Sequence, residues 1–78
     1  MNVTVKLLGT LRKFSHPDTP GRLSVELPEN TTVAELVERV VQRRAPVVAC
    51  AVNGYTRKMN TVISDGDEVV LLSKLGGG

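Results

Sequence analysis

The sequence predicts one α+β domain in which a single helix packs across one face of a mixed β-sheet. Three observations lead to this prediction: strand-like alternation near both ends of the chain, one amphipathic helical stretch in the middle, and a length of only 78 residues. A chain of this length forms one hydrophobic core at most. We expect one body over residues 1–74 and a flexible glycine tail over residues 75–78.

The first strand is expected over residues 1–8, where apolar and polar side chains alternate and Leu8 falls on the polar side. Residues 9–22 are rich in proline and glycine and are expected to form a loop, anchored in the core by Leu11 and Phe14. A second alternating strand follows and stops at Pro28; its apolar members are Leu23, Val25 and Leu27.

The helix is predicted from its first residues and from its apolar stripe. Thr32 and Glu35 have the spacing of a capping box, in which each side chain accepts a hydrogen bond from the other residue's backbone amide. The stripe consists of Val33, Leu36, Val37, Val40 and Val41. Arg43 and Arg44 are expected in the last turn, where they favour the helix dipole, and Pro46 prevents continuation. Strands are the only other elements, so the stripe must be buried on the sheet.

Two more strands are predicted in the second half of the chain. The small apolar run over residues 47–52 is typical of a strand buried on both faces, and Asn53-Gly54 is a strong hairpin-turn motif. Asp65-Gly66-Asp67 marks another turn before the final strand, residues 68–73, which we expect beside the first strand. In that strand Val69 and Leu71 face one way and Val70 and Leu72 the other. A hairpin, a crossing helix and a returning hairpin together describe a β-grasp fold.

Composition excludes several classes of function. Ten Lys and Arg against eight Asp and Glu leave a net charge of +2, and two aromatic residues are too few for stacking on bases, so we expect no nucleic-acid partner. No apolar run approaches the roughly 20 residues of a membrane span, and the first residues lack a signal-peptide pattern, so a cytoplasmic protein is expected. With one histidine and one cysteine, we expect no metal site and no bound cofactor; Cys50 is interpreted as a core residue.

The C-terminal sequence Leu75-Gly76-Gly77-Gly78 indicates a chemical role for the chain end. Glycines there can simply belong to a frayed terminus, because they have no side chain to pack. However, the stretch from Lys74 to Gly78 spans up to ~17 Å and has the slimness needed to thread a narrow active site that a Cβ would block. This shape suits a chain whose own C-terminal carboxylate is the reacting group.

The whole chain resembles the ThiS/MoaD family of ubiquitin-like sulfur carriers. The resemblance rests on the predicted β-grasp body, the turn Val52-Asn53-Gly54, the segment Asp65–Val69 and the terminal glycines. The opening Val5–Phe14, with its long first loop, is most similar to the small subunit of molybdopterin synthase. The chain departs from that pattern at Ser73-Lys74-Leu75, where prolines and an alanine are common, and in carrying a third glycine.

This resemblance implies a protein co-substrate and not an enzyme. An E1-like adenylyltransferase would use Mg and ATP to adenylate the Gly78 carboxylate, and a persulfide sulfur donor would then displace AMP to leave a thiocarboxylate. The carrier would pass the sulfur to a downstream synthase subunit in molybdopterin-type or related biosynthesis. Gly77 and Gly78 would carry the chemistry, with Leu75 and Gly76 lengthening the reach; either Gly77 or Gly78 can be the reacting end.

A docking patch for the activating enzyme is expected on the sheet face opposite the helix. Leu8, Val70 and Leu72 would form it, leading through Lys74 into the tail. Alternatively, these leucines pack under the loop that contains Phe14. A basic rim is expected from Lys6, Arg57, Lys58 and Lys74.

Two other functions fit the same sequence. A ubiquitin-like protein modifier, conjugated to target lysines through its C-terminal glycine, would use the same tail and the same activation. A non-catalytic β-grasp binding module would not need the glycines.

Overall fold

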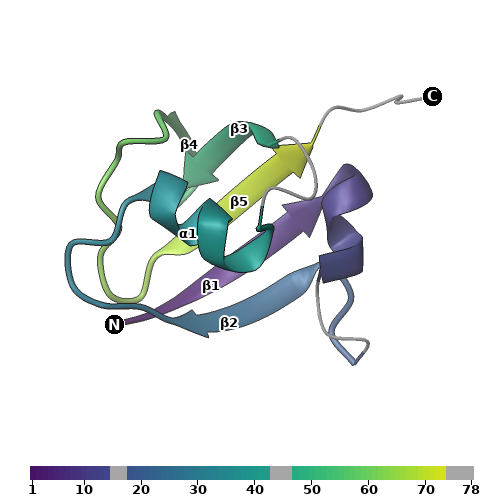
Figure 1. The fold of residues 1–78 in the computed structure, drawn as a ribbon, viewed down its shortest axis with the longest axis horizontal. Coiled ribbons are helices and arrows are strands. Elements are labelled where there is room, and N and C mark those ends of the chain that lie inside the picture. The colour runs from purple at the N-terminus through teal and green to yellow at the C-terminus, as the bar shows by residue number, and fades with distance from the viewer. Residues whose placement is uncertain (15–17, 43–46, 74–78) are drawn as a thin grey trace.

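A computed structural model describes residues 1–14, 18–42 and 47–73 of the chain. One mixed sheet has the strand order β2-β1-β5-β3-β4, and helix α1 crosses one of its faces (Figure 1). The elements are β1 (Asn2–Leu8), the 3₁₀ helix η1 (Gly9–Phe14), β2 (Arg22–Glu26), α1 (Val33–Val40), β3 (Val47–Val52), β4 (Tyr55–Arg57) and β5 (Glu68–Ser73). The predicted β-grasp arrangement of a mixed sheet and one main helix is confirmed.

Strand β5 lies at the centre of the sheet, between β1 and β3. It runs parallel to β1, with Leu8 opposite Leu72, and antiparallel to β3. β1 and β2 form one antiparallel hairpin, and β3 and β4 form the other. The expectation that the last strand pairs beside the first is therefore confirmed.

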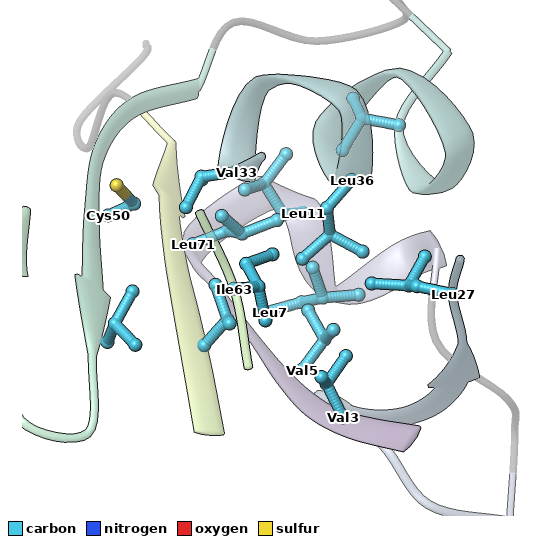
Figure 2. Close-up of a cluster of buried hydrophobic side chains, with 13 residues drawn as sticks. Val3, Val5, Leu7, Leu11, Leu27, Val33, Leu36, Cys50, Ile63 and Leu71 are labelled. Carbon is cyan, nitrogen blue, oxygen red and sulfur yellow. The ribbon is translucent and has the colours of Figure 1, made fainter. Parts of the chain in front are cut away.

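The core lies between the sheet and α1. Strand alternation turns one set of side chains from β1 and β5 toward the helix, where they are buried as predicted. Figure 2 shows this cluster, which includes Val3, Val5, Leu7, Leu11, Leu27, Val33, Leu36, Cys50, Ile63 and Leu71. The opposite face of the sheet has no helix over it among the described residues (Figure 1).

Helix α1 begins as predicted and ends earlier than predicted. The Thr32 side chain accepts a hydrogen bond from the Glu35 backbone amide at 3.2 Å, and a Glu35 carboxylate oxygen accepts one from the Thr32 amide at 3.1 Å. The helix ends at Val40 because Gln42 takes a left-handed backbone (φ 54°), through which an α-helix cannot continue. The prediction of a longer helix was wrong: it ends before Arg43 and Arg44, which lie outside the described residues.

Two other predictions need correction. The stretch predicted as a loop begins with η1. The sequence did not reveal this element, because a 3₁₀ helix of one or two turns is too short to show an apolar periodicity. Leu11 of η1 is buried, as expected. Strand β3 was predicted to be buried on both faces, but Val48 is 57% exposed and only Cys50 and Val52 are buried. A single helix covers one face of the sheet, and the apolar run alone does not reveal how many faces are covered.

No helix among residues 1–14, 18–42 and 47–73 is long and apolar enough to cross a membrane.

Candidate functional site: the end of β5 and the open sheet face

The candidate site is built around the point where β5 leads into the glycine tail. Ser73 is the last residue of β5 and is 1% exposed. The predicted site residues Lys74, Leu75, Gly76, Gly77 and Gly78 follow it directly and lie outside the described residues. The structure therefore defines the position from which the tail starts.

Ser73 is held by side-chain hydrogen bonds to the opposite end of the sequence. Its Oγ accepts one bond from the Thr10 backbone amide and one from Thr10 Oγ1, both at 3.0 Å. The Ser73 hydroxyl itself points to the Leu8 carbonyl oxygen at 3.4 Å. The serine thus joins the end of β5 to the end of β1 and the start of η1. Sequence reasoning missed this role, because one serine after an apolar strand carries no pattern.

An apolar groove of about 170 Å³ lies beside this point on the open face of the sheet. It is lined by Leu8, Ala49, Cys50, Ala51, Thr56, Val70 and Leu72. The structure therefore brings together the three described residues predicted to form the docking patch, since Leu8 pairs with Leu72 and both neighbour Val70 in the ladder. Leu8 is 44% exposed, so the described part of the first loop leaves it open to solvent.

Two of the four residues expected to form a basic rim around this patch, Lys6 and Arg57, do not contribute a free cation to it. Lys6 lies on the groove face, but its Nζ is 3.4 Å from a Glu68 carboxylate oxygen, which offsets its charge. Arg57 pairs opposite Cys50 in the antiparallel ladder, and residues that are paired in this way point to the same side of the sheet. Arg57 therefore points to the helix side, like Cys50, and its Cζ lies 5.7 Å from the centroid of the Tyr55 ring. The groove is thus mainly apolar, and its contribution to binding would come from buried apolar area.

Cys50 is part of the core and not a reactive sulfur. Its side chain is buried, and its Sγ donates a hydrogen bond to the Arg57 carbonyl oxygen at 3.1 Å. Burial raises the pKa of the Cys50 thiol above its ordinary 9.0, with a smaller opposing effect of that hydrogen bond. The thiol is therefore protonated at neutral pH and is a poor nucleophile, which confirms its assignment to the core. No cluster of His, Cys, Asp and Glu in the described part of the chain has the makings of a metal site.

Comparison with known proteins identifies similar chains along the whole length. The sequence profile of the ThiS family matches residues 5–78. The molybdopterin synthase sulfur carrier subunit of Mycobacterium tuberculosis is 32% identical over 84 residues, covering 100% of this chain and 99% of that protein. Small archaeal modifier protein 1 of Haloferax volcanii has a TM-score of 0.75 at 16% identity, covering 95% of this chain and 98% of that one.

A structure from Helicobacter pylori, a complex of subunits 1 and 2 of molybdopterin-converting factor, also matches. Its TM-score is 0.59 at 23% identity, covering 100% of both chains. At these identities the two structural matches show a shared fold.

Proposed function

The chain belongs to the ThiS family of small sulfur carriers, and from this premise we propose that its C-terminal carboxylate is the group that carries the sulfur. One observation above all supports the proposal: β5 ends beside an open apolar groove, and the sequence continues directly as Lys74-Leu75-Gly76-Gly77-Gly78. The family match extends through residue 78, so it includes these glycines. The body offers a docking surface, and the tail offers the reacting end.

The proposed chemistry proceeds in three steps on partner enzymes. In the first, an oxygen of the Gly78 carboxylate attacks the α-phosphorus of Mg-bound ATP on an E1-like adenylyltransferase, and pyrophosphate leaves. In the second, the outer sulfur of a persulfide donor attacks the acyl carbon, and AMP leaves. In the third, a second thiol attacks the donor's sulfur in the resulting acyl disulfide; the S–S bond breaks, a disulfide forms between the donor and this thiol, and a C-terminal thiocarboxylate leaves. The carrier supplies no acid, base or metal to any of these steps, so it is a co-substrate and not an enzyme.

The partners of this carrier follow from the same reasoning. The adenylyltransferase and the subunit that accepts the sulfur must both bring the chain end into a narrow site, and both would dock on the groove residues Leu8, Val70 and Leu72. The M. tuberculosis relative is by name a subunit of molybdopterin synthase, and the H. pylori structure holds two subunits of molybdopterin-converting factor. We therefore propose a synthase subunit as the acceptor, with Lys74 and Leu75 in its entrance and Gly76, Gly77 and Gly78 inside.

The proposal is tested by intact-mass spectrometry after incubation with an adenylyltransferase, Mg-ATP and a persulfide donor. The protein should exchange one oxygen for sulfur, and fragmentation should place the sulfur at Gly78. The control is the same mixture without ATP, in which no exchange should occur. Isopeptide conjugates to lysines would instead identify a protein modifier. A chain that gains no sulfur and forms no conjugate would contradict the proposal and favour a plain binding module.

A further inference from the structure

We propose that Ser73 and Thr10 are positioning residues that fix the point from which the tail leaves the body; this rests on the proposed function of the C-terminal carboxylate. The last residue of a strand commonly frays, because it has neighbours on fewer sides. Ser73 is instead fastened by its backbone and by its side chain. Its backbone pairs with Val47 of β3, and its hydroxyl bonds to Thr10 and faces Leu8.

The geometry makes this attachment more than ordinary packing. The Ser73 hydroxyl is buried, and it is the acceptor for two donors of one residue, the amide and the hydroxyl of Thr10. Thr10 stands in the first turn of η1, where backbone amides have no partner within the helix. Ser73 therefore acts as a cap for η1 from a strand 63 residues further along the sequence. Among the described residues, no buried side-chain polar atom lacks a hydrogen-bond partner, so separating Ser73 from Thr10 would cost the free energy of these hydrogen bonds.

A fixed starting point matters because the tail is short. Five residues, from Lys74 to Gly78, reach at most ~17 Å, and the carboxylate must come within roughly 3–3.5 Å of the group it reacts with. If the Ser73 end of β5 separates from η1, the same tail starts from many positions, and a smaller fraction of docked complexes places the carboxylate correctly. The pair should therefore influence the turnover of docked carrier, while the groove determines how tightly the carrier docks.

Two substitutions separate the hydroxyl contacts from the backbone contact. Ser73→Ala removes the acceptor for both Thr10 donors. Thr10→Val keeps the shape of the side chain and the amide bond to Ser73 but removes the Thr10 hydroxyl, whereas Thr10→Ser keeps both donors. Ser24→Ala is the matched control, because Ser24 is an exposed serine in β2, an edge strand of the sheet that is not next to β5.

The experiment measures sulfur loading at varied carrier concentration, well below the melting temperature of every variant. For Ser73→Ala we expect kcat to fall by about tenfold with KM within about twofold of the unsubstituted protein. Thr10→Val should show a smaller fall in kcat, and Thr10→Ser and Ser24→Ala should match the unsubstituted protein. Hydrogen exchange of the Thr10 amide, measured in the free protein, should be faster in Ser73→Ala.

Several results would overturn the inference. One is an unchanged kcat in Ser73→Ala together with faster exchange at Thr10. Another is a rise in KM at constant kcat, which would assign the pair to docking. If Ser73→Ala does not fold, the comparison of Thr10→Val with Thr10→Ser decides. Equal activity of those two variants would reject a role for the bond between the Thr10 and Ser73 hydroxyls. Failure of the unsubstituted protein to gain sulfur is a separate outcome, which would reject the proposed function itself.

Discussion

The Asn53 side chain donates a hydrogen bond of 2.9 Å from Nδ2 to Asp67 Oδ1, across 14 residues of sequence. Asn53 Oδ1 also accepts a bond from the Glu68 amide at 2.9 Å, and Asp67 Oδ2 accepts one from the Ser64 amide at 2.8 Å. The hairpin turn between β3 and β4 is thereby locked to the turn that precedes β5. These bonds fix the register in which β5 enters the sheet, and so they also fix where its other end, at Ser73, is placed.

Replacing Asn53 by alanine should lower the free energy of unfolding by about 1–2 kcal/mol, because two hydrogen bonds are lost and a left-handed backbone (φ 52°) is imposed on alanine. Thermal or urea denaturation measures the change. Asn60→Ala is the control, since Asn60 is an exposed asparagine in another turn, and it should alter stability by less than about 0.5 kcal/mol. Equal effects of the two substitutions would contradict a specific role for the Asn53–Asp67 bond.

Leu8→Glu should weaken docking to the activating enzyme by about tenfold or more and leave stability within about 0.5 kcal/mol. Leu8 is 44% exposed, so a glutamate there stays solvated in the free protein but is desolvated in an apolar interface. The KM for adenylation and the melting temperature are the two measurements. Leu72→Glu is a second variant on the same groove, with a half-buried side chain. Val62→Glu is the control for the added charge, because Val62 is an exposed apolar residue that does not line the groove.

Stability and docking are tested separately at Leu8. A lost thermal transition would show that Leu8 is needed for the fold, and unchanged adenylation kinetics would remove the groove from the docking surface.

Cys50 should react slowly with iodoacetamide in the native protein at pH 8 and fully after denaturation, because its thiol is buried and its pKa is raised above 9.0. The raised pKa also predicts a pH effect on stability. As the pH rises through 9.0, the unfolded thiol ionises while the folded thiol keeps its proton, so unfolding releases a proton and the free energy of unfolding falls.

Cys50→Ala serves as the reference for this pH effect. It should lack this component of the decline in stability above pH 9.0 and should keep full sulfur loading. Rapid native labelling, or loss of sulfur loading in Cys50→Ala, would show that the thiol takes part in the chemistry.

Gly77→Ala should lower the rate of adenylation by about tenfold or more, since a Cβ next to the reacting residue obstructs a narrow channel and restricts the backbone. Thermal stability should be unchanged, because residue 77 follows the body. Gly76→Ala is the matched control, one residue further from the carboxylate, and should have a smaller effect. Deletion of Gly78 completes the series: a gain in activity would identify Gly77 as the reacting end, and a loss would identify Gly78.

The parts of the fold with a local signature could be predicted from the sequence. Thr32 and Glu35 predicted the first turn of α1 because a capping box is completed within four residues. The two faces of β5 followed from strict alternation, and the expected pairing of the last strand with the first placed Val70 and Leu72 near Leu8. The end of α1 could not be predicted, because Gln42 takes a left-handed conformation that its residue type does not favour.

The parts of the site that depend on distant partners could not be predicted. Lys6 looked like a free cation in the sequence and is paired with Glu68, which becomes its neighbour only through the parallel pairing of β1 and β5. Arg57 was placed on the wrong side of the sheet, because its side is set by its register opposite Cys50. Ser73 and Thr10 likewise meet only after the sheet has formed.

The central position of β5 has a consequence for how the chain folds. β5 is the last strand in the sequence, yet it is the neighbour of both β1 and β3. The β1–β5 ladder can therefore form only when the two ends of the chain have been brought together, which closes a loop that contains all the other elements. Such non-local pairing makes folding slow for a protein of this size. During synthesis, neither the groove nor the Ser73 corner can form until the ribosome has released β5. On the proposed function, an enzyme that recognises the folded groove would therefore engage only chains in which β5 has joined the sheet.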